Sequence, residues 1–254
     1  MSSLKKNGEG RILLMKIPFV REWGSWVVFI ASVSAALITS SVAGAPDRGS
    51  GASSFTAFTI AGLTFLINSK NPLASAMRTG WKKKGHVAWF LFFSLFGLLL
   101  MAHFLVDGIR PFSPFSLLAF SYAVLLFRGK EHSLITELNG FALLTLTAPV
   151  VYFSVTGDLS LRLYAAVFLF FAAGVFKVRV RIRKTLNYRW IMALYCAGAS
   201  LMYFLLDINL IILLPLIENI LSVLLMREEK LRATGYIELT KGVLFLVLLA
   251  LFWE

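Results

Sequence analysis

Glu218 and Asn219 place two strongly polar side chains inside the long apolar stretch Ile208–Met226. An ionisable group within a membrane span is costly to bury, so its presence predicts a functional site. A carboxylate there could carry a proton or bind an ion, and the neighbouring amide could donate and accept hydrogen bonds. The pair could equally be structural, with Glu218 hydrogen-bonded across helices or kept neutral in a dry site. The sequence leaves both interpretations open.

A second chemical pattern is the basic run Phe176–Lys184, which follows a long apolar stretch. It predicts a helix leaving the membrane, with Arg179, Arg181 and Arg183 reaching toward lipid headgroups. A planar guanidinium makes two charge-assisted hydrogen bonds to one anion, so these arginines could clamp a phosphate or diphosphate. The simpler interpretation is a positively charged anchor that also attracts anionic lipid.

Asn68, Lys70 and Asn71, just before Pro72, form a similar polar and basic segment after an earlier apolar stretch, with Lys82–Lys84 beyond it. Pro72 predicts that the helix ends there or restarts as a short lid helix. The predicted ligand-binding set consists of Asn68, Lys70, Asn71, Arg179, Arg181, Arg183, Glu218 and Asn219. The expected ligand is an anionic amphiphile, either a phospholipid or an isoprenoid phosphate.

Other side chains are assigned less chemistry. Glu137, after the potential cap Ser133, is interpreted as a first-turn acid favoured by the helix dipole, and Glu238 as its equivalent in the last span. His86, His103 and His132 lack metal-ligand spacing, so no metal site is expected. There is no complete catalytic motif, and catalytic residues and cofactors stay unknown.

These residues need a membrane-spanning scaffold. Of the 254 residues, 58% are hydrophobic and only 15% are charged, against about 25% charged in a soluble domain. The net charge of +12 would suit nucleic-acid binding. However, the basic residues form short groups between apolar runs, as orientation signals do, so nucleic acid is not an expected partner.

The apolar runs predict an all-α, polytopic helical bundle of about nine spans. The fourth is short, with a bent start at Pro111 and Pro114, and the seventh and eighth meet in a tight hairpin at Asp207. The predicted spans are Trp23–Ala43, Ser53–Asn68, Val87–Val106, Phe115–Phe127, Leu134–Ser154, Leu161–Val178, Trp190–Leu206, Ile208–Met226 and Gly235–Trp253.

Charge distribution predicts the orientation. With the N-terminus inside, 22 of the 25 Lys and Arg residues fall on the cytoplasmic side, Lys177 and Lys241 being counted with the loops, and all four aspartates fall outside. The C-terminus is then outside. Residues 1–22 form a basic, interfacial cytoplasmic arm, residues 23–254 a single transmembrane domain, and the expected location is the inner (plasma) membrane.

Three short segments resemble the bacterial YwiC-like membrane proteins. Pro18–Trp26 is similar to their P-x-E-H-G-A-W opening, Phe176–Lys184 to their F-Y-V-R-x-R segment, and Gly235–Glu238 to their G-x-x-E. Trp23 stands where the histidine of that family is expected. The resemblance implies no established activity.

The architecture also resembles, more loosely, the UbiA-type intramembrane prenyltransferases. That resemblance implies aspartate-rich motifs for Mg²⁺ and a prenyl diphosphate after the second and sixth spans. Here all aspartates lie on the other side, which argues against metal-dependent diphosphate activation.

The sequence therefore predicts a protein that binds anionic membrane lipids at its cytoplasmic basic segments. One alternative is a small secondary transporter that uses Glu218. Another is a structural subunit of a larger complex, and a protein partner or a homo-oligomer is compatible with each.

Overall fold

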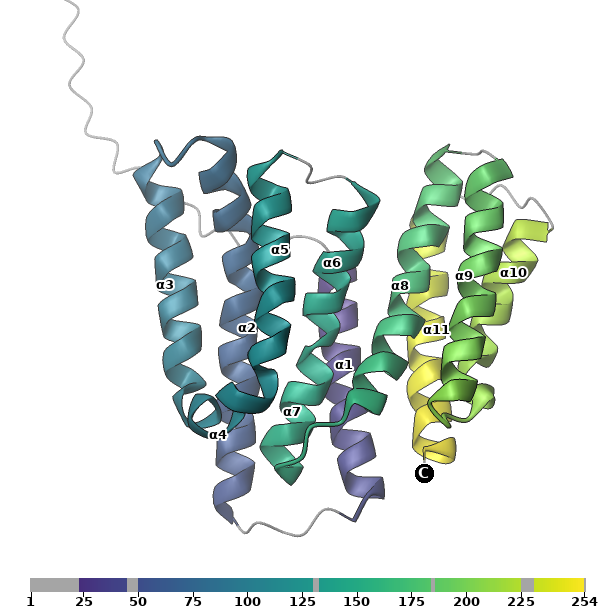
Figure 1. The fold of residues 1–254 in the computed structure, drawn as a ribbon, viewed down its shortest axis with the longest axis horizontal. Coiled ribbons are helices and arrows are strands. Elements are labelled where there is room, and N and C mark those ends of the chain that lie inside the picture. Colours follow the sequence, from purple (N-terminus) through teal and green to yellow (C-terminus); the bar gives the residue numbers. More distant parts are fainter. Residues whose placement is uncertain (1–22, 45–49, 130–132, 184–185, 225–230, 254) are drawn as a thin grey trace, which may run out of the picture.

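The computed structural model of the chain describes residues 23–44, 50–129, 133–183, 186–224 and 231–253. Within these ranges every regular element is a helix (Figure 1). The α-helices are α1 (Trp23–Val42), α2 (Ser50–Arg78), α3 (Lys84–Leu100), α4 (Ala102–Phe112), α5 (Ser116–Phe127), α6 (Leu134–Thr145), α7 (Thr147–Thr156), α8 (Leu161–Arg183), α9 (Leu186–Leu205), α10 (Ile217–Leu224) and α11 (Leu231–Phe252). Two 3₁₀ helices join them, η1 (Ser113–Phe115) and η2 (Leu210–Leu216).

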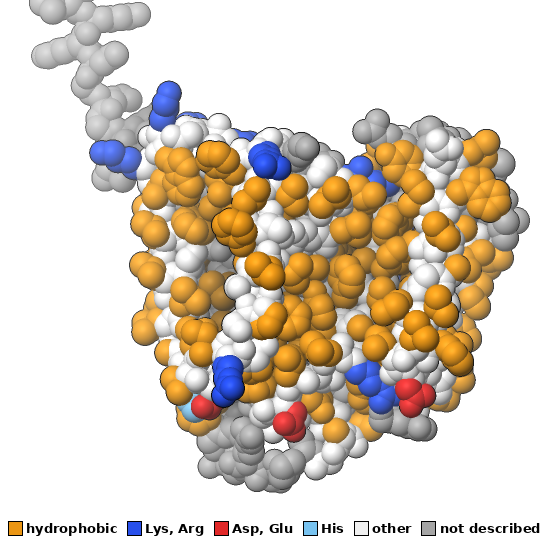
Figure 2. All heavy atoms as spheres, in the orientation of Figure 1, with side chains coloured by type: hydrophobic (Ala, Val, Ile, Leu, Met, Phe, Trp, Pro, Cys, Tyr) orange, Lys and Arg blue, Asp and Glu red, His pale blue; other side chains and the backbone are white. Residues whose placement is uncertain are grey.

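Several helices have the length and composition of membrane spans. Five described stretches are long and apolar enough to cross a bilayer: Trp23–Val42, Ala102–Phe127, Leu134–Thr156, Leu161–Ile182 and Thr234–Phe252. On the face drawn in Figure 2, hydrophobic side chains cover a broad band, with Lys and Arg along the upper margin and both acidic and basic side chains near the lower one. A protein whose outer surface is this apolar belongs in lipid, so the predicted all-α membrane class is confirmed.

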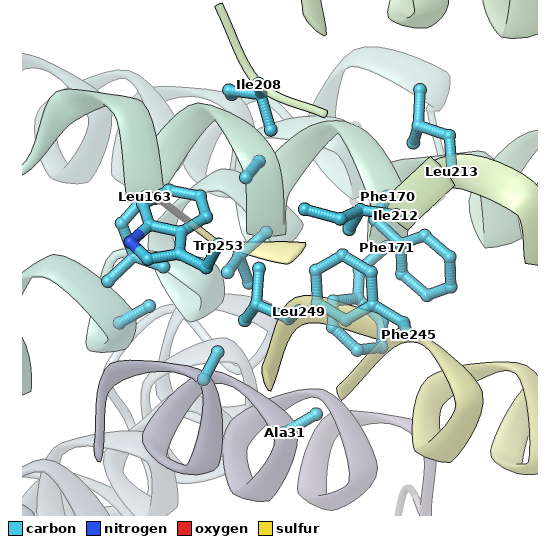
Figure 3. Close-up of a cluster of buried hydrophobic side chains, with 14 of the residues drawn as sticks. Ala31, Leu163, Phe170, Phe171, Ile208, Ile212, Leu213, Phe245, Leu249 and Trp253 are labelled. Atoms are coloured by element: carbon cyan, nitrogen blue, oxygen red, sulfur yellow. The ribbon is translucent and has the colours of Figure 1, made fainter. Parts of the chain in front are cut away.

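The main hydrophobic core lies between α1, α8, η2 and α11. Helix α1 contributes the small buried side chains Ala31, Ala35 and Ala36, which allow neighbouring helices to approach closely. Phe170 of α8 stacks on Phe245 of α11 with their ring centroids 4.1 Å apart (Figure 3). This packing holds α8 against α11, the two helices that carry most of the site described below.

A second close contact joins α2 to α3. A Cβ atom on Gly62 would lie 2.7 Å from the Gly97 carbonyl oxygen, and one on Gly97 would lie 2.9 Å from the Gly62 carbonyl oxygen. Either glycine therefore allows a backbone approach that any larger residue would prevent. In Figure 1 these two helices form one side of the bundle, away from α8 to α11.

The tight hairpin predicted at Asp207 is confirmed. The Asp207 backbone is left-handed, with φ of 55°, a conformation that Asp tolerates better than most side chains. The Ile208 N–H donates to the Tyr203 carbonyl at 2.9 Å, which closes the end of α9. The Asn209 side chain then accepts from the Ile211 N–H at 3.0 Å and starts η2.

The break predicted at Pro72 is wrong. Helix α2 continues from Ser50 to Arg78 with Pro72 inside it. A proline removes one hydrogen bond and forces a local adjustment, but the surrounding helix packs on α3 and α7 and can absorb that cost.

Two predicted spans also have different bounds. The third was expected over Val87–Val106, but α3 ends at Leu100 and a separate helix, α4, begins at Ala102. The bent start of the fourth is confirmed, since η1 at Ser113–Phe115 joins α4 to α5. The eighth begins as the 3₁₀ helix η2 and continues as the α-helix α10 from Ile217, one residue before Glu218.

Candidate functional site

Five polar side chains from three helices meet near one end of the bundle, and we call them the charged centre. Helix α8 provides Lys177, α10 provides Glu218 and Asn219 from its first turn, and α11 provides Glu238 and Lys241. Glu238 and Lys241 are three residues apart on α11, a spacing that puts them on one face.

The charged centre lies inside the helices. Lys177 precedes the end of α8 at Arg183 by six residues, and Glu218 precedes the end of α10 at Leu224 by six. At 1.5 Å per residue, each lies roughly 9 Å from its helix end. Lys241 lies ten residues into α11. These helix ends share the upper end of the bundle in Figure 1, so the side chains meet at a similar depth.

The two lysines and two glutamates form a connected network. Lys177 pairs with Glu218, and its Nζ lies 3.0 Å from Glu238 Oε1. Lys241 Nζ lies 2.6 Å from Glu238 Oε1 and 3.4 Å from Glu218 Oε2. Lys241 also donates to Asn219 Oδ1. Each carboxylate is thus shared by two ammonium groups, and the four charges sum to zero.

Burial differs between the cations and the anions. The side chains of Lys177 and Lys241 are only 1% and 7% exposed, whereas those of Glu218 and Glu238 are 33% and 30% exposed. The ammonium groups therefore lie deeper and the carboxylates nearer the surface. An uncompensated buried charge is strongly unfavourable, so each buried ammonium requires its carboxylate partners.

Asn219 is fully buried, and of its two amide atoms only the oxygen has a hydrogen-bond partner among the described residues. Its Oδ1 accepts from Lys241, which fixes the orientation of the amide, because its NH₂ group and the ammonium are both donors. The Asn219 Nδ2 atom has no hydrogen-bond acceptor among the described residues. Buried donors without acceptors are rare and costly, so this atom points to an acceptor other than the side chains that the structure describes.

The surroundings of the charged centre are small and apolar. A Cβ on Gly174 of α8 would lie 3.5 Å from Glu238 Oε2, and one on Gly242 of α11 would lie 3.6 Å from the Phe171 ring. A Cβ at either position would make only an ordinary van der Waals contact, so the two glycines leave the side chains around the charges uncrowded. Buried Cys196 of α9 adds a thiol to the same region.

Arg179 forms a separate ion pair on another face of α8. Its Nε atom lies 2.9 Å from Glu137 Oε2 of α6. Ser133 caps α6 as predicted, with its hydroxyl accepting from the Thr136 N–H at 3.2 Å. Glu137 is thus both a first-turn acid and the partner of Arg179, and the guanidinium predicted to clamp a phosphate is bound to a carboxylate.

The other predicted ligands are not gathered into one place. Asn68 is buried and donates to the Thr64 carbonyl of its own helix at 2.8 Å. Lys70, Asn71 and Arg181 are half-buried. In Figure 1, α5 and α6 stand between the ends of α2 and α8, so the two basic segments do not face each other. The Arg183 side chain lies outside the described part of the structure.

Glu218 and Asn219 are therefore the two predicted residues that the structure brings together, and it adds three that were missed. Lys177 and Lys241 were counted as orientation signals, and Glu238 as a dipole partner. One signal was available: Lys241 lies within the predicted span Gly235–Trp253, where a lysine needs a partner. Among the described residues, no group of three or more His, Cys, Asp and Glu side chains could hold a metal ion.

The opposite end of the bundle has a different kind of polar contact. Arg162 of α8 donates to the Asp207 carbonyl, and its guanidinium lies 5.2 Å from the centre of the Trp253 ring. These contacts fasten α8, the hairpin after α9 and the end of α11 together. On α2 and α4, Phe55 stacks on His103 beside a cavity of about 30 Å³, room for one water molecule.

No known protein family, curated protein or solved structure matches the chain.

Proposed function

We propose that the chain is a nine-span protein of the inner (plasma) membrane with its N-terminus inside and its C-terminus outside. The alternation of helix ends supports this, since α2, α5 and α8 end at one side of the bundle and α1, α7 and α9 at the other (Figure 1). The basic residues gather at the first side. Reporter fusions after Arg128 and Arg181 should read inside and those after Asp158 and Asp207 outside. Two successive fusions on one side would contradict the topology.

We further propose that the charged centre is the ion-exchange site of a small secondary transporter, with Glu218 as the proton-carrying group. The observation that carries this proposal is that Glu218, one third exposed, is shared by two deeply buried ammonium groups within apolar helices. Intramembrane ionisable residues of this kind mark ion and proton pathways. A purely structural ion pair would need only one cation for each carboxylate.

The geometry suggests how exchange would proceed. A proton that arrives from the upper end of the bundle meets the carboxylates first, because they are more exposed than the lysines. Protonation of Glu218 leaves Lys177 and Lys241 sharing Glu238 alone, so the network gains one net positive charge. That charge must be balanced by a co-transported ion or by movement of the helices. Such movement would take place at the 3₁₀ segment η2, which ends two residues before Glu218, since mid-span 3₁₀ turns often mark hinges.

The three helices that hold the centre also carry two of the segments that resemble YwiC-like proteins. Phe176–Lys184 includes Lys177, and Gly235–Glu238 ends on Glu238. We propose on this ground that the chain is a YwiC-like protein and that the charged centre is its functional site.

Charge movement after an acid jump tests the transport proposal. Purified protein in liposomes, adsorbed on a solid-supported electrode, should give a transient current when the pH is lowered, because a proton enters the low-dielectric centre. Glu218→Gln keeps the shape of the side chain and removes the titrating group, so the current should be lost.

The matched control is Glu137→Gln, which removes a carboxylate from an ion pair at the same end of the bundle. Its current should stay at the wild-type level. A current that survives Glu218→Gln in folded protein would exclude Glu218 as the proton carrier. Loss of folding in Glu218→Gln, with wild-type protein giving no current, would favour the structural interpretation.

A second candidate is binding of an anionic lipid at the basic end. The observation in its favour is the gathering of Lys and Arg at the upper margin of the molecule in Figure 2. Clusters of this kind attract anionic headgroups. Because Arg179 is paired with Glu137, a headgroup would need other donors.

A further inference from the structure

We infer that the charged centre binds an oxyanion, held by Lys177, Lys241 and the Asn219 amide, together with a proton on Glu218. This inference rests on the proposed proton-carrying role and names the class of substrate. The shared chemistry is a phosphate-like or sulfate-like group, either a free anion from water or the headgroup of an anionic phospholipid.

Charge balance favours an anion over a cation. Two lysines and two glutamates sum to zero in the resting centre. The carboxylates lie nearer the surface and repel an approaching anion as long as both are ionised. Protonation of one carboxylate leaves a net positive charge with the two buried ammonium groups, which attract an anion and repel a cation. The site therefore suits an anion that enters together with a proton.

The hydrogen-bond donors of the charged centre also favour an anion. Asn219 Nδ2 is a buried donor with no acceptor among the described residues, and it belongs to the same amide that accepts from Lys241. Each ammonium carries three N–H donors. When Glu218 is protonated, Lys177 and Lys241 each lose one carboxylate contact, and the donor that Lys241 regains adjoins the Asn219 amide. An oxyanion is the ligand that accepts from several such donors at once.

Within the described part of the chain, three helices bring titratable or charged groups to the surroundings of Glu218. Helix α8 contributes Lys177, and α11 contributes Glu238 and Lys241. Helix α9 contributes the buried Cys196 and Tyr195, whose hydroxyl donates to the Leu169 carbonyl at 2.9 Å.

Of these groups only Glu218 and Glu238 can neutralise an added negative charge by taking up a proton. Glu218 contacts both lysines directly and its neighbour is Asn219, so it is the better placed of the two. The resulting coupling is reciprocal: the anion favours the proton and the proton favours the anion.

The experiment measures proton entry driven by an anion gradient. Protein in liposomes of neutral lipid, with a pH-sensitive dye inside, is given external inorganic phosphate or sulfate. Internal acidification beyond that of protein-free liposomes is expected. Equal additions of sodium or potassium as salts of a non-transported buffer should have no effect. A parallel sample with phosphatidylglycerol is examined for lipid retained after gentle purification, by native mass spectrometry.

Asn219→Asp tests the donor directly. It keeps the acceptor that faces Lys241 but replaces Nδ2 with a repelling oxygen. Anion-driven acidification, or retained anionic lipid, should fall about tenfold or more, since a hydrogen bond to a charged ligand is lost. Asn139→Asp is the matched control: this half-buried amide lies 2.5 Å from the Ser121 hydroxyl, outside the charged centre, and the change should leave the flux intact.

The outcomes separate the two proposals. Acidification by phosphate or sulfate in neutral lipid would identify a free oxyanion. Retention of phosphatidylglycerol that is lost in Asn219→Asp, without such flux, would identify the headgroup. Wild-type protein that gives the acid-jump current but neither of these results would overturn the oxyanion inference alone. Acidification driven by sodium or potassium would also overturn it, and absence of the acid-jump current would remove the proposed function itself.

Discussion

Helix α8 carries two cations two residues apart, Lys177 and Arg179, and they face different neighbours. Lys177 is 1% exposed and pairs with two carboxylates from α10 and α11. Arg179 is 12% exposed and pairs with the single carboxylate of Glu137 on α6. Residues two positions apart point to nearly opposite sides of a helix, so one helix serves two charge environments.

The contrast shows which of the two sites can exchange a proton and remain intact. If Glu137 is neutralised, Arg179 loses the carboxylate that its Nε contacts, and it is more exposed than Lys177, at 12% against 1%. If Glu218 is neutralised, Lys177 keeps Glu238 as a partner. A shared network can therefore change its protonation state without leaving a buried cation uncompensated. The Arg179–Glu137 pair is better suited to holding α6 against α8.

Removal of the buried cation gives the largest expected effect. Lys177→Met deletes the ammonium and leaves two carboxylates with Lys241 as their nearest cation. We expect the free energy of unfolding to fall by about 3 kcal/mol, the lower end of the range for breaking a buried ion pair, because the carboxylates are a third exposed. Thermal unfolding in detergent, followed by circular dichroism, measures this loss.

The matched change on the other face of α8 should cost much less. Arg179→Met breaks an ion pair that is more exposed than the network, at 12% for Arg179 and 36% for Glu137, so we expect a loss of about 1 kcal/mol, the upper end for exposed pairs. If both variants lose the same free energy of unfolding, the Lys177 network and the Arg179–Glu137 pair contribute equally, and the proposed difference between them is wrong. If Lys177→Met unfolds and Arg179→Met is unaffected, the distinction holds and Lys177 should be studied through Glu218 variants instead.

The sequence predicted two of the five residues of the charged centre, the two that lie deep in an apolar stretch. Glu218 and Asn219 stand out because nearly all of their neighbours are hydrophobic. Lys177 and Lys241 were not predicted as site residues because lysines near span ends are normally orientation signals. Their position in the chain alone does not show which neighbouring helix the side chain faces. Helix packing decides whether a lysine near a span end faces the membrane surface or a site inside the bundle.

The pairing of Arg179 with Glu137 was hidden for a similar reason. The two residues are 42 positions apart, and only the packing of α6 against α8 brings them together. The continuation of α2 through Pro72 also depends on tertiary contacts, since local preference alone favours a break. In contrast, the hairpin at Asp207 was predictable because two apolar runs meet there with almost no chain between them.

The central claim is that Glu218 takes up the proton that the charged centre exchanges. Infrared difference spectroscopy of the reconstituted protein tests it most directly, since a protonated carboxyl group has its own C=O stretching band. On acidification we predict a component of this band that is present in wild-type protein and in Glu137→Gln and missing in Glu218→Gln. A band with every component unchanged in Glu218→Gln would contradict the account.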